Sequence, residues 1–332
     1  MSAQITVLMP VYNCENYVGQ AIESILNQTF TDFNFLIIDD GSTDKTLEQI
    51  QCFSDSRIKI RKNKNNKGLI NVLNEAYPMI KTPFIARMDS DDYCDDKRLE
   101  SQIKFMKDKP EVDVCGTHYS FFGVRNETIY MPMNSSKITL KLLEGCPVLH
   151  GSMMIRTNCI SKIKFNSNYN YAEDYGMFCD AFPNLKLANI NKVLYYYRVE
   201  NHNTSIVHRR KQLESHEKAR KTLLRTLGVQ LNNEESSVFH RVVEGQYLLS
   251  ITELSIYEKV ANQIITCNKK IVLFNTELLE KKLKHYFFWS AFYSSRYGMA
   301  IYKLYKKSNL NKELSIKHIV EFWIRCLLKI KK

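Results

Sequence analysis

The sequence predicts an α/β protein with a Rossmann-like, mostly parallel sheet and helices on both faces, followed by a helical C-terminal region. Three observations predict this fold. Short apolar runs alternate with helical patterns over the first 100 residues, and a polar cluster follows several of those runs. Strand-like runs then stop near residue 206, where the pattern becomes helical. Strands that alternate with helices indicate βαβ units and hence a buried parallel sheet.

The first 100 residues divide into strands and helices by these patterns. Residues 5–9 form an apolar run that we expect to end at Pro10. The next helix, over 17–26, places Val18, Ile22 and Ile25 at helical spacing. Ser42 or Thr43 is expected to cap a helix that reaches about residue 53. The remaining expected elements are strands at 33–38, 58–60 and 84–88 and a helix at 68–77.

The pattern between residues 100 and 206 is mixed, and it is helical afterwards. We expect a helix at 97–107 and strands at 112–116, 153–156 and 192–198. The expected division is therefore one domain over residues 1–206 and a helical region over 207–332. Ligands of parallel α/β sheets bind beyond the carboxyl ends of the strands. The polar clusters at 10–13, 39–44 and 89–92 all follow expected strands.

The formal net charge of +12 is unevenly distributed along the chain. Residues 1–206 hold 23 basic and 24 acidic side chains, whereas residues 280–332 hold 13 and 3. The body is thus close to neutral, and the basic excess lies in the tail. Nine scattered cysteines without CxxC pairs are typical of reduced thiols in a cytosolic protein. We see no signal peptide and no run of 18 apolar residues, so we expect a cytoplasmic protein.

The strongest chemical feature is the acidic run from Asp89 to Asp92 directly after the strand at 84–88. Carboxylates so close together repel one another unless a cation neutralises them. Hard oxygen ligands suit Mg²⁺ or Mn²⁺, which keep positions open for substrate phosphates. The alternative is a solvated acidic turn before the next helix. The position in a βα series favours the metal.

Two further polar clusters follow strands. The run from Asp39 to Asp44 offers a strand-end carboxylate that can accept hydrogen bonds from a nucleobase or ribose, with Gly41 permitting close approach. A plain strand-to-helix turn explains the same residues. The cluster Pro10, Tyr12 and Asn13 is either a plain loop or one with Tyr12 available to stack on a base.

Taken together, these motifs resemble a family-2 glycosyltransferase with the GT-A nucleotide-sugar fold. The resemblance covers roughly residues 3–206, and it depends on the order and spacing of the motifs more than on any one of them. The residues that carry it are 9–13, 39–44, Gly68-Leu69, Leu73-Asn74, 86–92, Arg98-Leu99-Glu100, Gln102, 172–175, Tyr197-Arg198 and Ser205.

The resemblance implies roles for single residues. Asp40 matches the acid that pairs with the uracil of a UDP-sugar, with Pro10, Tyr12 and Asn13 lining the same pocket. Asp89 and Asp91 match the ends of a DxD motif: the first faces the ribose or the metal, and the second is the principal ligand of Mn²⁺ or Mg²⁺. Arg87 lies where a basic residue meets the nucleotide, although a packing role is equally compatible.

Asp174 matches the catalytic base of inverting members, with Glu173 beside it. Such a base takes the acceptor's proton while a divalent cation stabilises the leaving diphosphate. One base without a covalent intermediate predicts inversion. The alternative for Glu173 and Asp174 is an acid pair at a helix N-terminus, favoured by the helix dipole.

The sequence departs from the family pattern at two histidines. Relatives often carry a histidine two residues after Tyr-Arg, but Glu200 occupies that position. His202 either takes over the metal-facing role or lies on the surface. His150-Gly151 stands where many relatives have His-Pro, and His150 either touches the acceptor or packs in the core.

The tail at 280–332 combines its basic residues with many aromatic ones. Over 318–332 a basic stripe runs beside a broad apolar face, which is typical of a helix lying in a membrane interface. The alternative is a helical appendage packed on the rest of the protein. Nucleic-acid binding is disfavoured because no RNP, OB-fold or zinc-finger signature is present.

We therefore predict an inverting, metal-dependent glycosyltransferase at the inner face of the cell membrane. It would move a hexose or N-acetylhexosamine from a UDP-sugar to a hydroxyl of a cell-envelope glycan or glycolipid of the lipopolysaccharide, capsule or O-antigen type. Transfer to a polyprenyl phosphate and non-catalytic binding of a nucleotide-sugar are the alternatives. A dehydrogenase is disfavoured because no GxGxxG follows the first strand.

Overall fold

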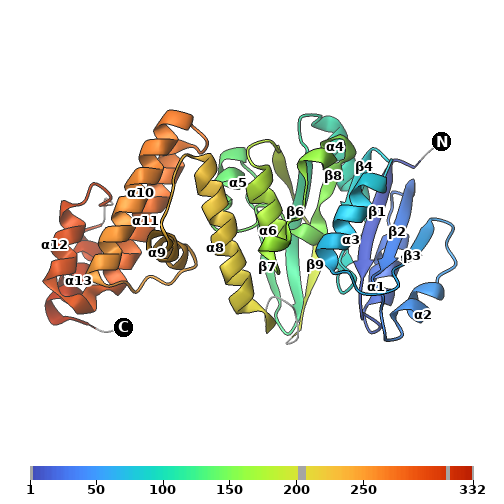
Figure 1. The fold of residues 1–332 in the computed structure, drawn as a ribbon, viewed down its shortest axis with the longest axis horizontal. Coiled ribbons are helices and arrows are strands. Elements are labelled where there is room, and N and C mark those ends of the chain that lie inside the picture. The colour runs from blue at the N-terminus through green and yellow to red at the C-terminus, as the bar shows by residue number, and fades with distance from the viewer. Residues whose placement is uncertain (1–2, 201–206, 312–314, 331–332) are drawn as a thin grey trace. The chain divides into compact units, whose positions relative to one another are not determined.

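The computed structural model describes residues 3–200, 207–311 and 315–330. The chain falls into two compact units. One comprises residues 1–138 and 146–216, and the other comprises 139–145 and 217–332. The first unit holds the sheet and the second is helical (Figure 1). The expected limit at residue 206 lies outside the described residues, and the units divide after residue 216.

A nine-stranded sheet forms the centre of the first unit. Its order is β3-β2-β1-β4-β8-β6-β9-β5, and β7 pairs with β6. The strands are β1 (Ile5–Val11), β2 (Phe33–Asp39), β3 (Ile58–Lys62), β4 (Phe84–Arg87), β5 (Tyr93–Cys94), β6 (Val114–Gly123), β7 (Glu127–Ile129), β8 (Met154–Arg156) and β9 (Leu187–Val199).

The first four strands are parallel, and the other half of the sheet is mixed. β8 runs antiparallel to both β4 and β6, whereas β6 and β9 are parallel. In the parallel half, Val11 at the end of β1 pairs with Asp39 at the end of β2, and Leu8 pairs with Arg87. The polar loops after β1, β2 and β4 therefore meet at one edge of the sheet, as the sequence predicts for a parallel arrangement.

Both faces of the sheet are covered, which explains why every residue of β1 is buried. On one face, alternate residues of β1 pack with α1 and α4 in a single apolar core; α3 contacts β1 as well. The helices of this unit are α1 (Val18–Leu26), α2 (Thr46–Gln51), α3 (Leu69–Ala76), α4 (Arg98–Asp108), α6 (Glu173–Ala181) and the start of α8 (Arg209–Thr226), with short 3₁₀ turns η1 (Tyr77–Met79), η2 (His150–Ser152), η3 (Thr157–Lys162) and η4 (Ser167–Tyr169).

Two local predictions were wrong. β1 continues through Pro10 to Val11, because a proline lacks only its own N–H and its carbonyl and φ are compatible with a strand. Neither Ser42 nor Thr43 caps α2, whose N-cap residue is Lys45. Both residues instead bond to Asn13 in the neighbouring loop.

The helical unit is held together by an aromatic core. Phe287, Phe288 and Tyr305 are buried, and the Tyr305 ring contacts both phenylalanine rings. Phe322 of the last helix packs against Phe288 and Tyr305. Most aromatic residues of the tail thus serve packing. α5 (Ser135–Lys141) ends within residues 139–145; the other elements are α9 (Asn233–Val243), α10 (Ile251–Ile271), α11 (Thr276–Tyr293), η5 (Ser295–Tyr297), α12 (Met299–Lys307) and α13 (Ile316–Leu328).

Candidate active site

The acidic run after β4 begins with a buried ion pair. Arg87 is 1% exposed, and its Nη2 lies 2.6 Å from Oδ1 of Asp89. Arg87 also donates to the carbonyl oxygen of Met88. Burial opposes ionisation of Asp89, but the charges of Arg87 and His150 and the hydrogen bonds from Arg87 and Tyr195 together hold the pKa of Asp89 below its usual value. Asp89 is thus ionised and oriented by a neighbour from its own strand.

Asp91 and Asp92 are in a different electrostatic state. Burial and then the charge of Asp89 raise the pKa of Asp91 to about 6. Burial and the charges of Asp91 and Asp89 raise the pKa of Asp92 well above its usual value. Asp92 is buried and accepts a hydrogen bond from the backbone N–H of Arg198 at 2.7 Å, so it ties the run to β9. The raised pKa values of Asp91 and Asp92 mean that their surroundings do not neutralise three ionised carboxylates.

This donor set fits a divalent cation. Asp91 makes no ion pair within the described part of the chain, and an added cation would relieve the repulsion that raises its pKa. Residues 3–200, 207–311 and 315–330 contain no group of three or more His, Cys, Asp or Glu arranged to hold a metal. In phosphate chemistry, Mg²⁺ is usually bound by one or two protein carboxylates, and water and phosphate oxygens complete its coordination shell. His202, the other candidate ligand, lies outside the described residues.

A buried arginine joins the acidic run to the turn that carries His150. Arg98 of α4 donates to the carbonyl oxygens of Arg87 and Gly151, at 2.5 and 3.0 Å. Gln102, one turn along α4, accepts from Arg98 and donates to the carbonyl oxygen of Ser152 at 2.8 Å. Because burying an unpaired guanidinium is costly, these bonds fix the end of β4 against η2.

Gly151 is the point of closest approach in this region. A Cβ at this position would lie 2.2 Å from the Tyr195 hydroxyl and 2.5 Å from Oδ2 of Asp89. The Tyr195 hydroxyl in turn accepts from the backbone N–H of Asp89 at 3.2 Å. Only a glycine leaves room for Asp89 and Tyr195 at this distance, which gives a reason for His-Gly in place of His-Pro.

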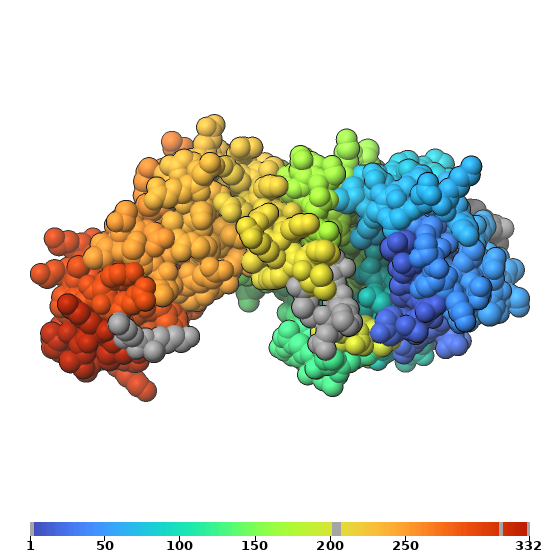
Figure 2. All heavy atoms as spheres, turned by 60° about the horizontal axis from the view of Figure 1, so that its bottom comes forward, coloured from blue at the N-terminus to red at the C-terminus, as the bar shows by residue number. Residues whose placement is uncertain are grey.

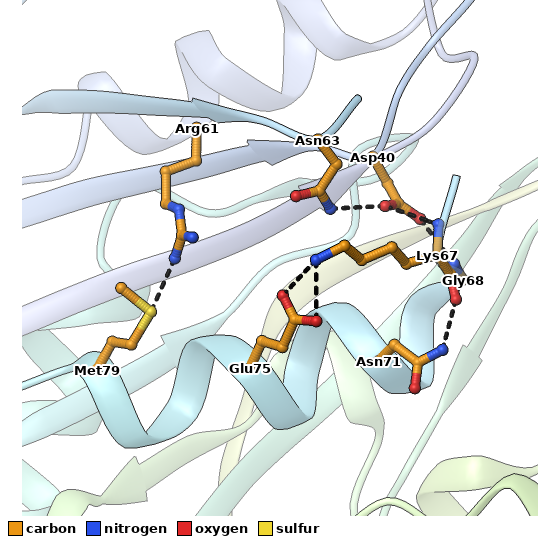
Figure 3. A network of polar contacts seen from close by, with 8 residues as sticks. All are labelled: Asp40, Arg61, Asn63, Lys67, Gly68, Asn71, Glu75 and Met79. Carbon is orange, nitrogen blue, oxygen red and sulfur yellow. Dashed lines mark hydrogen bonds and ion pairs between the residues drawn. The ribbon is translucent and has the colours of Figure 1, made fainter. Parts of the chain in front are cut away.

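Asp40 holds the loop that leads into α3 (Figure 3). Its carboxylate accepts from the Asn63 side chain at 2.7 Å and from the backbone N–H groups of Lys67 and Gly68. These bonds use the acceptor sites of both oxygens. The uracil-pairing role of Asp40 stays a prediction, and it would require sharing these oxygens. Asp39 next to it has a buried Oδ2 without a hydrogen-bond partner among the described residues.

The loop after β1 is fixed to the loop after β2. The Asn13 backbone N–H donates to Oγ of Ser42 at 3.0 Å, and its Oδ1 accepts from the backbone N–H of Thr43 at 2.9 Å. Asn13 has φ +45°, a conformation that asparagine tolerates better than most residues. Pro10 is buried in β1, and Tyr12 is 47% exposed at the same edge of the sheet. Tyr12 is therefore available for stacking on a planar ligand.

His150 lies between the two acidic motifs. It is buried against Phe165, and its Nδ1 is 4.0 Å from Oε1 of Glu173. Burial and the charge of Arg87 lower the pKa of His150 to about 4, while Asp174 and Asp89 act in the opposite direction. The imidazole is therefore neutral near pH 7. Since both Asp89 and Asp174 act on this one ring, the structure brings the strand-end acids and the acids of α6 together.

Glu173 and Asp174 occupy the first turn of α6, the position named by the helix-terminus alternative, and their catalytic role stays a prediction. Burial and then the charge of Asp174 raise the pKa of Glu173 to about 7. Asp174 accepts from the thiol of Cys146, with 3.1 Å between Sγ and Oδ2. Glu173 therefore keeps its proton to a higher pH than an ordinary glutamate does.

Sequence reasoning missed two residues of this site, Tyr195 and Cys146, and the packing role of a third, Gly151. Tyr195 contacts Asp89, Cys146 contacts Asp174, and Gly151 makes the close packing possible. The His150-Gly151 motif pointed to the third, whereas nothing in the spacing of Tyr195 or Cys146 distinguishes them from core residues.

Comparison with known proteins agrees with this arrangement. The profile described as "Glycosyl transferase family 2" matches residues 6–163. An uncharacterized glycosyltransferase of Haemophilus influenzae is 33% identical over 185 residues, which are 55% of this chain and 73% of that protein. The UDP-Glc:alpha-D-GlcNAc-diphosphoundecaprenol beta-1,3-glucosyltransferase WfaP of Escherichia coli is 27% identical over 73% of this chain and 93% of its own length.

A solved structure shares the fold over most of the chain. The structure of S. aureus TarS 1-349 in complex with UDP-GlcNAc superposes with a TM-score of 0.59 at 18% identity, and the match covers 86% of this chain and 90% of that one. The fold, the strand-end acids and the sequence relatives agree with one another, and the chain belongs to glycosyltransferase family 2.

Proposed function

We propose that this glycosyltransferase moves a hexose or N-acetylhexosamine from a UDP-sugar to a hydroxyl group of a lipid-linked cell-envelope glycan, with inversion at the anomeric carbon. The observation that carries the proposal is the convergence of two acidic motifs on the turn at His150 and Gly151. Oε1 of Glu173 lies 4.0 Å from Nδ1 of His150, and a Cβ at Gly151 would lie 2.5 Å from Oδ2 of Asp89. One motif suits the diphosphate side of the reaction and the other suits the acceptor side. The named UDP-glucose donor of WfaP and the UDP-GlcNAc bound by TarS support the donor class.

On the donor side, Asp91 and Asp89 would hold Mn²⁺ or Mg²⁺, which when bound neutralises charge on the leaving diphosphate. Arg87 keeps Asp89 ionised and in place. Tyr12 and Asn13, with Asp39 and Asp40 beside them, form the edge at which the uridine would bind. The acceptor of WfaP is a sugar on a diphosphate lipid, and this supports a lipid-linked glycan as the acceptor class here.

On the acceptor side, Asp174 takes the proton of the attacking hydroxyl group. The acceptor oxygen forms a bond to the anomeric carbon while the bond from that carbon to the UDP oxygen breaks, and UDP leaves with the electron pair. One carboxylate is sufficient for this single displacement. Neutral His150 lies beside Glu173, and Glu173 with its pKa near 7 would be largely protonated at a mildly acidic pH.

The test is a screen of UDP-sugars for Mn²⁺-dependent transfer to a lipid-linked acceptor, followed by two variants. Asp174→Asn should lower kcat by about 10²-fold or more, because general-base catalysis contributes that much. Asp91→Asn should raise the Mn²⁺ concentration required for activity. Asp108→Asn, at an exposed position of α4, is the control. Transfer that survives Asp174→Asn would favour a polyprenyl phosphate acceptor, which requires no strong base. Lack of any turnover by the unmodified protein would favour a binding function.

We also propose that the enzyme works at the inner face of the cell membrane. None of the described helices is long and apolar enough to span a bilayer, so attachment would be peripheral. α13 docks through Phe322 and Cys326 and leaves a stripe of large apolar side chains exposed. The lysines beside that stripe suit anionic lipid headgroups. Figure 2 shows the atoms of this C-terminal segment, in dark red, at the molecular surface.

A further inference from the structure

The loop before α6 has a conformation that a side chain disfavours. Tyr171, three residues before Asp174, has φ +65°. This left-handed region is uncommon for a bulky residue, and such residues persist only where their surroundings hold them. The position of the acidic turn therefore depends on contacts made by the loop over residues 169–171.

On one side the loop packs on α6 itself. A Cβ at Gly176 would lie 2.1 Å from the ring of Tyr169, so the ring rests directly on the helix backbone. The Tyr169 hydroxyl donates to Oδ1 of Asp180 at 2.8 Å. These contacts fix the start of the loop and leave Asn170 and Tyr171 to be held from elsewhere.

The beginning of α8 provides the second set of contacts, all within the unit that contains the sheet. Nε2 of Gln212 donates to the carbonyl oxygen of Tyr171 at 3.0 Å, and Oγ of Ser215 donates to that of Asn170 at 2.8 Å. His208 stacks on the Tyr171 ring with 4.1 Å between centroids, and His216 meets Tyr175 edge-on. Ser215 is buried. Because the two hydrogen bonds go to main-chain atoms, they fix the backbone that precedes the acids.

We propose that residues 208–216 act as a clamp that sets the position of Asp174, with Gln212 and Ser215 as positioning residues. The inference rests on the proposed role of Asp174 as base. It goes beyond the family match, which ends at residue 163. The clamp assigns a catalytic purpose to the start of α8, where sequence reasoning saw only the beginning of a helical appendage. Loss of the two hydrogen bonds should let the turn relax and misplace the carboxylate, with little effect on the nucleotide side.

The test uses the full chain with Gln212→Leu/Ser215→Ala, Ser215→Ala alone and Ser215→Thr. Three quantities are measured: kcat and KM for sugar transfer, the Kd for UDP with Mn²⁺, and the melting temperature. We expect the double variant to lower kcat by about tenfold or more, since small misplacements of reacting groups have effects of this size. The Kd for UDP should stay within about twofold, and Ser215→Thr, which keeps the hydroxyl donor, should restore most of the rate lost in Ser215→Ala.

The control is Lys218→Ala, an exposed position on the same helix, which should leave kcat unchanged. The clamp is refuted if the double variant turns over like the unmodified enzyme, or if kcat and UDP affinity fall in parallel. If the double variant does not fold, the pair Ser215→Ala and Ser215→Thr decides the question by the same criteria. Asp174→Asn separates the two proposals. If Asp174→Asn stays active, the assignment of Asp174 as the base has failed. If Asp174→Asn is inactive while the clamp variants turn over normally, only the clamp proposal is refuted.

Discussion

The Sγ atom of Cys146 lies 3.1 Å from Oδ2 of Asp174. Burial and the charge of Asp174 raise the pKa of this thiol well above its usual value, so the sulfur keeps its proton near neutral pH and donates to the carboxylate. A thiol is a weak donor, yet here it restricts the rotation of the side chain that we propose as the base.

Replacing Cys146 should therefore affect turnover. We expect Cys146→Ala to lower kcat about fivefold, the equivalent of one hydrogen bond of roughly 1 kcal/mol. Cys146→Ser keeps a donor and should retain a rate close to that of the unmodified enzyme. Steady-state kinetics with the preferred UDP-sugar provide the measurement, and Cys52→Ala, at an exposed position, is the control. Equal rates for the alanine and serine variants would show that the thiol contact is irrelevant to catalysis.

Gly151→Ala should impair the donor side. The added methyl group would overlap Oδ2 of Asp89 and the Tyr195 hydroxyl, so one of them must move. Overpacking of this kind costs about 1–3 kcal/mol. We expect weaker UDP binding with Mn²⁺ by roughly tenfold, measured by calorimetry, together with a lower melting temperature.

Gly19 of α1 is the matched control for this substitution. A Cβ at Gly19 would meet nothing within 4 Å. Because alanine has the higher helix propensity, Gly19→Ala should stabilise the protein by up to about 1 kcal/mol. If Gly151→Ala bound UDP as tightly as Gly19→Ala does, the packing of Asp89 against Gly151 would have no bearing on the nucleotide.

Glu173→Gln should stabilise the protein increasingly as the pH rises. The pKa of Glu173 is about 7 in the folded chain, against an ordinary value of 4.5. The folded state thus holds the proton more tightly, and its stability decreases as the pH rises from 4.5 through 7. Glutamine removes this penalty. The gain in free energy of unfolding should be on the order of 2 kcal/mol larger at pH 8 than at pH 5.

Urea denaturation of both proteins at the two pH values measures this difference. Glu111→Gln, at an exposed position, is the matched control and should show the same gain at each pH. A gain for Glu173→Gln that is larger at pH 5 than at pH 8 would mean that Glu173 is ionised in the folded protein and held by partners.

The parallel half of the sheet was predictable because each strand is a short apolar run followed by a polar loop. β1 to β4 and their helices lie within a few residues of the expected positions. The mixed half of the sheet was harder to predict, since the pairing of β6 with β9 joins residues about 70 positions apart in the sequence. A register between such distant segments is set by tertiary packing and leaves no local pattern.

The residues of the candidate site also divide into those that the sequence predicts and those that only the fold brings together. The acids at 89–92 and 173–174 stand out because charged residues directly follow a strand or begin a helix. Tyr195 was not recognisable, since it is one of three consecutive tyrosines in β9 and only the pairing of strands brings it to Asp89. Arg98 was part of a recognised motif, but only the folded chain brings the carbonyl oxygens of Arg87 and Gly151 together around its guanidinium group.

The tail illustrates how packing narrows a sequence prediction. Residues 280–332 read as a uniformly basic and aromatic segment, yet many of the aromatic rings are buried in the helical unit. Tyr297 of η5 and one stripe of α13 remain exposed at the surface. Its exposed apolar side chains recur at helical spacing, and they are Ile316, Val320, Trp323, Ile324, Leu327 and Leu328.

Vesicle binding should depend on this stripe. An open groove along α13 is lined by three apolar residues, two basic ones and one acidic one, namely Val320, Ile324, Ile330, Lys317, Arg325 and Glu321. Apolar insertion and attraction of lysine and arginine to anionic headgroups, about 1 kcal/mol for each basic residue, would act together there. We expect co-sedimentation with vesicles containing phosphatidylglycerol, much weaker binding to neutral phosphatidylcholine vesicles, and release at high salt.

Val320→Glu/Ile324→Glu should reduce binding to the anionic vesicles by about tenfold or more. Val124→Glu, which adds a negative charge at an exposed valine of the other unit, is the control and should bind normally. Equal binding by the α13 variant would refute the membrane surface. So would a stable dimer of the unmodified chain that the same substitutions dissociate, because the stripe would then be covered by a second copy.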